Sequence, residues 1–244
     1  MSNFLAEILK RKQREVESLV SPVRFEEALK KEGLSVIAEI KRKSPSKGVL
    51  NSAIDPVELA KKYVAGGASA ISVLTDEEGF GGKLEDLKAV IAACPGIPVL
   101  RKDFIIDLKQ LDETARAGAH AVLLIVAALG EKLSEFIQAA KNYGLETLVE
   151  VHDLDELKLA QKAGSAIIGV NNRNLSTFKV SLETAKNLSS HFLPHVIKVA
   201  ESGIENQEDA AVMRKAGYDA VLVGESLVKS LHPEALIEEM RHAH

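Results

Sequence analysis

Two residues of opposite charge end the first strongly apolar run of the sequence, VIAEIK at residues 36–41. Glu39 and Lys41 are two positions apart, and side chains at positions i and i+2 of a strand point to the same face. An isolated buried charge is costly, but a hydrogen-bonded lysine and glutamate offset one another. The pair is therefore either a structural salt bridge or part of an acid–base site, in which neighbouring charges shift one another's pKa values.

Five further apolar runs also end in polar residues or glycine. One charged residue at a strand end is weak evidence for a site, since such residues often only meet solvent. The repetition of this feature indicates one shared active site, because side chains from the carboxyl ends of parallel strands converge there. The candidates beyond Glu39 and Lys41 are Lys102, Glu150, Asn171 with Arg173, Glu201 with Ser202, and Gly224 with Glu225 and Ser226.

A repeat places these residues in the fold. The segments AGGASAISVLTD, AGAHAVLLIVAA, AGSAIIGVNNRN and AGYDAVLVGESL begin at Ala65, Ala117, Ala163 and Ala216, so that their first glycines are 52, 46 and 53 residues apart. Each Ala-Gly pair ends an amphipathic pattern, as expected of a helix C-terminus, and precedes a β-branched run. The repeat therefore predicts a helix followed by a strand, four times.

Four more apolar runs alternate with these segments and bring the predicted strands to eight. They cover residues 35–40, 97–104, 145–152 and 195–202, and helical patterns cover 55–66, 84–93, 107–118, 130–144, 153–164, 181–192, 205–217 and 232–243. Apolar strands that alternate with helices predict a parallel sheet covered by helices. Eight such units predict an α/β fold of the (β/α)8, or TIM, barrel type. An open doubly wound sheet is the alternative, which the lack of a natural edge strand disfavours.

Length and composition fit one soluble domain. Such barrels take about 250 residues, so we expect residues 35–244 to form the barrel and residues 1–34 to form an N-terminal helical extension of the same domain. The net charge of −4 excludes a generally basic nucleic-acid binder. The N-terminus lacks the long apolar run of a signal peptide or membrane span, and a single cysteine fits a reducing compartment. We therefore expect a cytoplasmic protein that binds neither nucleic acid nor membrane.

The last two strands indicate a phosphate site. Gly203 and Gly224 follow these strands directly, and a glycine lets backbone N–H groups approach an anion closely. The segment ESLVKS then predicts a short extra helix at the usual phosphate site of these barrels. Each glycine alone could be only a turn residue.

Other kinds of site have no signal in the sequence. Histidine, cysteine and aspartate residues are not spaced as metal ligands, and there is no glycine fingerprint for a dinucleotide, so we expect neither a metal nor an organic cofactor. Cys94 falls late in a predicted helix and is expected to be inert packing. His152 has no evident partner and is interpreted as a polar residue of the rim.

Six motifs in this order carry a family resemblance that covers the chain from Val36 onward. AEIKRKSPSKG, LRKDFI, LVEVH, IGVNNRNL, VAESGI and VLVGESL resemble indole-3-glycerol-phosphate synthase of tryptophan biosynthesis. The resemblance implies a carboxy-lyase that acts on 1-(2-carboxyphenylamino)-1-deoxyribulose 5-phosphate. It closes the pyrrole ring and releases indole-3-glycerol phosphate, carbon dioxide and water. Contacts with other enzymes of the same pathway are a further expectation about partners.

The resemblance also implies roles for individual residues. Lys102 would be the general acid of ring closure, Glu150 would act in the dehydration, and Lys41 would hold the substrate carboxylate or phosphate. The division of proton transfers between the two lysines stays open. Glu39 and Glu201 would position the two lysines, Asn171 would hydrogen-bond substrate hydroxyls, and Arg173 would support the rim. Ser44 would also contact the substrate. The phosphate would bind at Gly203, Gly224 and Glu225, with Ser202 beside them, and the aromatic ring would lie against Phe80, Phe104 and Leu123.

Two rival interpretations remain. One is another phosphate-binding barrel, such as phosphoribosylanthranilate isomerase, whose chemistry depends on a Cys/Asp pair at strand ends; the position of Cys94 and the Glu-x-Lys end of the first strand argue against it. The other is a non-catalytic barrel that serves as a structural partner. Such a protein should have lost part of the Lys/Glu set, which is complete here.

Overall fold

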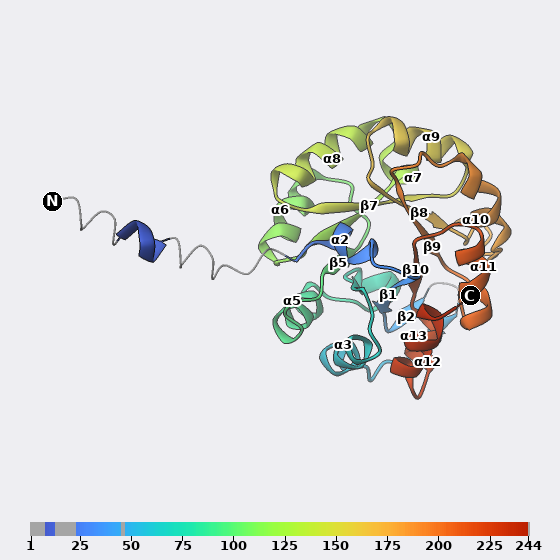
Figure 1. The fold of residues 1–244 in the computed structure, drawn as a ribbon, viewed down its shortest axis with the longest axis horizontal. Helices are drawn as coiled ribbons and strands as arrows, with labels where there is room; N and C mark the ends of the chain where they lie inside the picture. The colour runs from blue at the N-terminus through green and yellow to red at the C-terminus, as the bar shows by residue number, and fades with distance from the viewer. Residues whose placement is uncertain (1–7, 13–22, 45–46, 244) are drawn as a thin grey trace.

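Eight parallel strands close into a barrel at the centre of the molecule (Figure 1). The computed structural model describes residues 8–12, 23–44 and 47–243. Each strand pairs with the next one along the chain, and the last pairs with the first. This closure confirms the predicted (β/α)8 barrel, and the open doubly wound alternative is wrong. The barrel strands are β1 (Ser35–Ile40), β4 (Ala70–Leu74), β5 (Val99–Lys102), β6 (Ala121–Ile125), β7 (Glu146–Val151), β8 (Ile167–Asn171), β9 (Ile197–Glu201) and β10 (Ala220–Val223).

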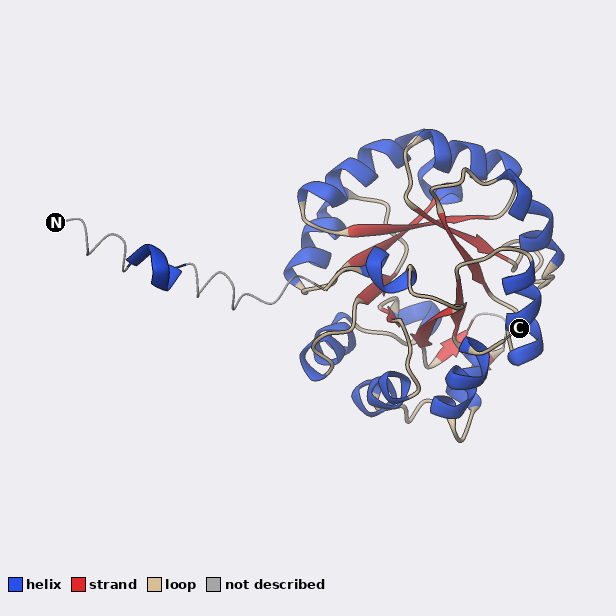
Figure 2. Ribbon diagram, viewed as in Figure 1, coloured by secondary structure: helices blue, strands red, loops and turns tan. Residues whose placement is uncertain are grey.

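Helices form an outer layer around the strands (Figure 2). A small antiparallel pair, β2 (Lys43–Ser44) and β3 (Gly48–Val49), lies in the connection after β1. The helices are α2 (Phe25–Leu29), α3 (Pro56–Ala65), α4 (Glu77–Phe80), α5 (Leu84–Ala93), α6 (Leu108–Arg116), α7 (Val126–Leu129), α8 (Leu133–Asn142), α9 (Leu154–Lys162), α10 (Glu183–Leu188), α11 (Gln207–Lys215), α12 (Glu225–Lys229) and α13 (Pro233–Arg241), with 3-10 turns η1 (Gly130–Lys132) and η2 (Ser189–His191).

The sequence pattern and the structure differ after β6. A single helix was predicted over residues 130–144, but the chain forms α7 directly after the strand, then η1, then α8. Gly130 has a φ of 51°, in the left-handed region that only glycine adopts without strain, and it separates the two helices. Most of the other predicted elements begin or end within a few residues of the observed bounds.

The helix ends follow the sequence signals. Gly118, Gly164 and Gly217 directly follow the C-cap residues of α6, α9 and α11 and have φ values of 83°, 81° and 85°. In the first repeat the left-handed residue is Gly67, one position later than predicted. At the other ends, side chains accept hydrogen bonds from backbone N–H groups of the first helical turn; these N-cap residues include Asp55, Asp107, Asp153 and Asn206.

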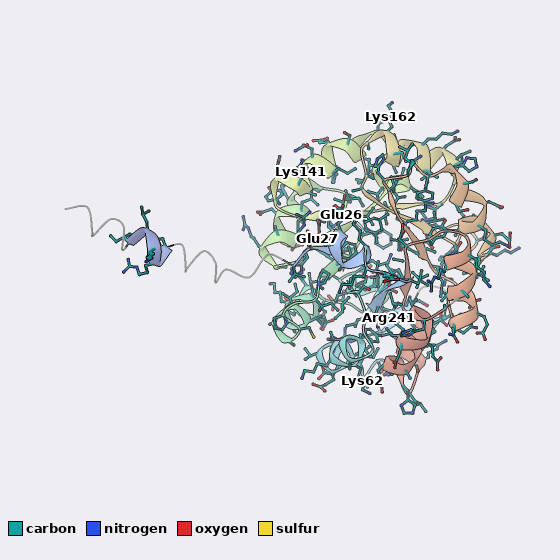
Figure 3. All side chains as sticks on the ribbon, in the orientation of Figure 1. Glu26, Glu27, Lys62, Lys141, Lys162 and Arg241 are labelled. Carbon is teal, nitrogen blue, oxygen red and sulfur yellow. The ribbon has the colours of Figure 1, made fainter. Side chains whose placement is uncertain are left out.

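Charged side chains on the outer layer match the helix dipoles. Acidic residues near a helix N-terminus and basic residues near a C-terminus are favourable, because the unpaired backbone groups there carry partial charge. Figure 3 labels six such residues: Glu26 and Glu27 lie in the first turn of α2, and Lys62, Lys141, Lys162 and Arg241 lie in the last turns of α3, α8, α9 and α13.

The apolar core has two parts. The larger part lies between the strands and the outer helices, and the smaller part fills the barrel interior. Phe25 and Leu29 of α2 belong to the interior part together with Ile37 of β1. Glu146, at the start of β7, accepts hydrogen bonds from the backbone N–H groups of Phe25 and Glu26. Helix α2 therefore closes the end of the barrel at which the strands begin.

The predicted N-terminal extension is described only in part. Residues 8–12 are helical and α2 follows, whereas residues 1–7 and 13–22 lie outside the described residues. The division into residues 1–34 and 35–244 stays a prediction. None of the helices in the described parts of the chain is both long and apolar enough to cross a membrane.

Candidate active site

The polar residues at the strand ends continue the inward-facing positions of their strands. Because side chains alternate along a strand, a residue two positions after an interior apolar residue also points inward. At the carboxyl end of the barrel this next residue is polar or glycine in six of the eight strands. The interior residue and its successor are Ile37 and Glu39, Leu100 and Lys102, Leu148 and Glu150, Ile167 and Gly169, Val199 and Glu201, and Leu222 and Gly224.

Lys102 lies between two buried carboxylates from different strands. Its Nζ is 3.3 Å from Oε2 of Glu150 on β7 and 3.2 Å from Oε2 of Glu201 on β9. The two glutamate side chains are 3% and 2% exposed, and that of Lys102 is 14% exposed. Asn171, at the end of the intervening strand β8, donates a hydrogen bond from Nδ2 to Oε1 of Glu150 at 3.1 Å. The structure thus brings together four predicted site residues from four strands.

The two carboxylates on Lys102 have different proton affinities. Burial, together with the charges of Glu150 and Glu39, raises the pKa of Glu201 to about 7 against the opposing effect of Lys102. Burial would also raise the pKa of Glu150, but Lys102, His152 and Asn171 together lower it to about 2. For Lys102, burial acts to lower the pKa, and the carboxylates of Glu201, Glu150 and Glu39 outweigh it and hold the pKa above its usual range. At neutral pH the site therefore contains a charged lysine, an ionised Glu150 and a Glu201 that holds a proton part of the time.

Glu39 and Lys41 form a salt bridge. Lys41 Nζ is 2.7 Å from Oε1 of Glu39, and the side chains are 15% and 3% exposed. Gly224, at the end of the adjacent strand β10, faces this pair. A Cβ at position 224 would overlap Glu39 Oε1 and lie 3.0 Å from Lys41 Nζ. Glycine is therefore needed here to make room for the salt bridge, besides any contact with a ligand.

The predicted phosphate residues of this region directly follow β9 and β10, and Glu225 is the first residue of α12. Ser202 and Gly203 both have positive φ values, 65° and 81°, directly after β9. The predicted short helix is α12, which begins at Glu225. The Glu225 carboxylate is 2.7 Å from Lys47 Nζ and 2.6 Å from Lys229 Nζ. Because these two lysines neutralise the Glu225 carboxylate, that side chain adds no unpaired negative charge near the predicted phosphate site.

Phe80 and Phe104 approach each other at the barrel mouth, with ring centroids 6.3 Å apart. Phe104 is 48% exposed, whereas Leu123 is buried in the barrel interior. Ile125 of β6 pairs with Glu150 of β7, and Leu123 lies two residues before Ile125. Leu123 therefore lies one layer below the carboxylates, and the two phenylalanines lie toward the rim.

Two other predicted residues belong to loops. Ser44 is buried in β2 and its hydroxyl accepts a hydrogen bond from the backbone N–H of Lys47; its neighbours 45 and 46 lie outside the described residues. Arg173 follows β8, where its backbone N–H donates to Oδ1 of Asn171 at 3.0 Å. This contact fixes the Asn171 amide so that its nitrogen faces Glu150.

The interpretation of His152 as a residue without a partner is wrong. Its Nε2 is 3.3 Å from Oε1 of Glu150 and its Nδ1 is 3.0 Å from Oε2 of Glu156. Its side chain is only 15% exposed. The sequence did place His152 two residues after Glu150, but the second partner comes from the first turn of α9, four residues later. The VHDLDE segment at residues 151–156 could have indicated this contact, because it places a histidine at the end of a strand and a glutamate in the first turn of the next helix.

Gly169 is a further site residue that the sequence argument missed. A Cβ at this position would overlap Oε1 of Glu201 and lie 3.3 Å from Leu148 Cδ1. A glycine within a buried strand often marks such a close approach, so the IIGV run carried a usable signal. Gly169 makes the space that Glu201 occupies.

Cys94 is distant from this site. It is the C-cap of α5 and lines a cavity of about 770 Å³ with residues of α2, the helix that closes the opposite end of the barrel. Burial raises the pKa of its thiol, as for a packing residue. Among residues 8–12, 23–44 and 47–243 no cluster of three or more histidine, cysteine, aspartate or glutamate side chains is arranged to hold a metal ion.

Comparison with known proteins matches one family over nearly the whole chain. The family model described as Indole-3-glycerol phosphate synthase matches residues 4–240. A protein of that name from Streptomyces griseus is 50% identical over 214 residues, which cover 87% of this chain and 79% of that protein. One from Chlorobium luteolum is 45% identical, with 98% of each chain covered.

Solved structures show the same fold at low identity. Tryptophan synthase subunit alpha from Legionella pneumophila has a TM-score of 0.67 and 16% identity over 91% of this chain and 98% of that chain. A 3-hexulose-6-phosphate synthase has a TM-score of 0.68 and 18% identity over 86% and 99%. At 16% and 18% identity these two structures support the barrel alone, whereas the family match and the relatives at 50% and 45% identity show the family. The chain belongs to the indole-3-glycerol phosphate synthase family.

Proposed function

We propose that this protein converts 1-(2-carboxyphenylamino)-1-deoxyribulose 5-phosphate to indole-3-glycerol phosphate, carbon dioxide and water by general acid–base catalysis. The observation that carries the proposal is the buried contact of Lys102 with both Glu150 and Glu201. It supplies a proton donor and two potential acceptors within one small volume. Family membership supplies the substrate.

Lys102 is the proposed acid of ring closure. Its position between two carboxylates keeps its ammonium group charged at neutral pH, because its pKa is held above the usual range by Glu201, Glu150 and Glu39 against the effect of burial. The ammonium group can therefore protonate the ribulose carbonyl oxygen as the new carbon–carbon bond forms. Loss of carbon dioxide restores the aromatic ring. Glu150, ionised beside Lys102, then serves in the loss of water.

Binding roles follow from charge and position. Lys41 has its Nζ beside Gly224 and the predicted phosphate segment, so it is the proposed contact for the phosphate or the carboxylate of the substrate, with Glu39 holding it. Backbone N–H groups near Gly203, Gly224 and Glu225 are the proposed phosphate ligands, with Ser202 beside them. Asn171 is proposed to bind substrate hydroxyls, and Arg173 to support the rim.

The aromatic ring of the substrate is proposed to lie against Phe80 and Phe104, whose rings approach each other at the mouth. Leu123 would form the apolar floor below them, and Ser44 would contact the substrate from the loop after β1. An aromatic ring held edge-on or offset against phenylalanine gains about 0.5–1.5 kcal/mol beyond its buried area. This contact would orient the ring for attack on the carbonyl carbon.

The rival functions have less support. The isomerase interpretation needs a cysteine at a strand end, and Cys94 instead caps α5 near the closed end of the barrel. The non-catalytic interpretation leaves the cost of three buried carboxylates, Glu39, Glu150 and Glu201, without a purpose.

The direct test is turnover of the purified protein with the carboxyphenylamino substrate. The chain contains no tryptophan, so the fluorescence of the product indole should rise over a low protein background. Carbon dioxide should be released in equal amount. A folded protein that produces neither indole fluorescence nor carbon dioxide would show that the proposed function is wrong.

A further inference from the structure

His152 occupies a position that the reaction described above does not use. It directly follows β7 and precedes Asp153, the N-cap of α9. Its ring nonetheless lies against Glu150, because Nε2 is 3.3 Å from Oε1 of that carboxylate. The His152 ring is mostly buried, with 15% of its side chain exposed.

The His152 ring lies between two carboxylates from different elements. Glu150 of β7 faces Nε2 at 3.3 Å, and Glu156 of α9 faces Nδ1 at 3.0 Å. A neutral imidazole can donate from only one nitrogen, so a ring with an acceptor carboxylate at each nitrogen is suited to the doubly protonated, charged form. Nε2 is buried and its contact with Glu150 is not an aligned hydrogen bond, so the ring acts on Glu150 through this close contact and through its positive charge.

Glu156 fixes the ring in place. Its Oε2 accepts a hydrogen bond from the backbone N–H of His152 at 2.7 Å and also contacts the ring at Nδ1. Glu156 lies in the first turn of α9, where the helix dipole favours a negative charge. Asp153 caps the same turn by accepting from the backbone of Asp155 and Glu156. The position of the His152 ring is therefore fixed by Glu156, whose own position is fixed by its place in the first turn of α9.

The charge of His152 makes the surroundings of Glu150 different from those of Glu201, although both carboxylates contact Lys102. One lysine shared equally by Glu150 and Glu201 would not decide which of them holds a proton. His152 adds a second positive charge on the Glu150 side only, and Asn171 adds a hydrogen bond to the same carboxylate. Glu201 has neither, and its Oε1 has no hydrogen-bond partner. Two carboxylates in one site can take different roles when their surroundings differ in this way.

We propose that His152, held by Glu156, is a positioning residue that keeps Glu150 ionised and oriented for proton transfer, and so assigns the shared proton of the site to Glu201. The charged groups that contact the His152 ring are Glu150 and Glu156. Glu150 in turn contacts Lys102, whose charge is also affected by Glu201 and Glu39. The directions of the pKa values agree with the contacts. Burial lowers the pKa of His152, but Glu150 and Glu156 raise it to about 10.

The catalytic meaning of this inference rests on the proposed function, but its test does not require turnover. The carboxyl carbons of glutamate and the ring nitrogens of histidine are titrated by NMR in uniformly labelled protein, with Glu150→Gln and His152→Gln used to assign the signals. In the wild type the His152 ring should stay doubly protonated through pH 8, and Glu150 should titrate well below Glu201. A nearby opposite charge changes a pKa by roughly 1–3 units, so His152→Gln should raise the pKa of Glu150 by that amount.

Two variants separate charge from structure. Glu156→Gln keeps an acceptor for the backbone N–H of His152 but removes the charge, so the pKa of His152 should fall by roughly 1–3 units. His232→Gln changes a histidine whose side chain is 78% exposed and should alter neither titration. In the enzyme assay, His152→Gln should move the acidic limb of kcat to higher pH with KM nearly unchanged, as expected when only the proton-transfer group is affected.

Three results would overturn the inference. A His152 ring that is neutral at pH 7 would remove its charge from the argument. A Glu150 titration that is the same in His152→Gln and wild type would show that His152 has only a structural role, even if kcat falls. An unchanged His152 titration in Glu156→Gln would show that Glu156 does not hold the ring charged. A wild-type protein that fails to turn over the substrate would refute the proposed function instead and leave these titrations unaffected.

Discussion

Substitution of Gly169 by alanine should disable the site without unfolding the barrel. The added Cβ would lie well under 3.0 Å from Glu201 Oε1, a separation that real Cβ atoms essentially never show. The neighbouring contact to Leu148 Cδ1 would be 3.3 Å and leaves little room on the other side. The Glu201 carboxylate must therefore move by about an ångström, and a misplacement of that size can lower a rate by about 100-fold.

The effect on stability should be smaller than the effect on activity. Overpacking of a buried position costs about 1–3 kcal/mol, compared with about 5–15 kcal/mol for the free energy of unfolding of a typical domain. Gly169→Ala should therefore keep its circular-dichroism spectrum and show a moderately lower Tm. Ile168→Val is the matched control, because Ile168 belongs to the core outside the barrel and its change should cost about 0.5–1.5 kcal/mol with kcat preserved.

The assay is steady-state indole fluorescence with each variant, followed by thermal unfolding of the same samples. Gly169→Ala should lose kcat by about 100-fold, and Ile168→Val should not, although both variants are destabilised. If Gly169→Ala keeps the kcat of the wild type while folded, the position of the Glu201 carboxylate does not matter for catalysis.

Three other predictions concern ligands and pH. Inorganic phosphate should compete with substrate, and Lys41→Met should weaken that competition and raise KM; a KM that does not respond to phosphate would contradict the phosphate site near β9 and β10. Activity should survive exhaustive chelation and dialysis, and restoration of lost activity by a metal ion would refute the metal-free mechanism. Because the folded pKa of Glu201 is raised to about 7, above its unfolded value, its contribution to stability should be complete below the unfolded pKa and be lost as pH rises toward 7. Glu201→Gln should remove this part of the pH dependence in chemical unfolding, and an unchanged pH dependence would mean that Glu201 is not the group concerned.

The barrel and the inward face of the site could be predicted because both depend on local patterns. The eight strand–helix units follow from apolar runs and helix signals, and the alternation of side chains places Lys102, Glu150 and Glu201 on the inner face. Gly130 shows the limit of this approach, because its φ of 51° divides a segment whose periodicity predicts one continuous helix.

Contacts between distant elements could not be predicted in the same way. The sequence did not indicate that Lys102 touches both Glu150 and Glu201 rather than one of them, since that depends on the size of the barrel and its strand register. The partner of His152 comes from a helix, and the need for glycine at 169 and 224 comes from side chains on neighbouring strands. In each case a residue's environment is created by chain segments that are far apart in the sequence or across an element boundary.

Lys102 and Glu150 are proposed to carry distinct proton transfers at one site. Single-turnover experiments that follow carbon dioxide release and indole formation separately distinguish the two transfers, in the wild type, Lys102→Ala and Glu150→Gln. General acid–base groups contribute about 10²–10⁴-fold to rate, so Lys102→Ala should slow both signals by at least the lower value while its circular-dichroism spectrum stays that of a folded barrel. Glu150→Gln should release carbon dioxide faster than it forms indole. Near-normal rates in folded Lys102→Ala, or equal slowing of both signals in Glu150→Gln, would show that the two residues do not divide the proton transfers in this way.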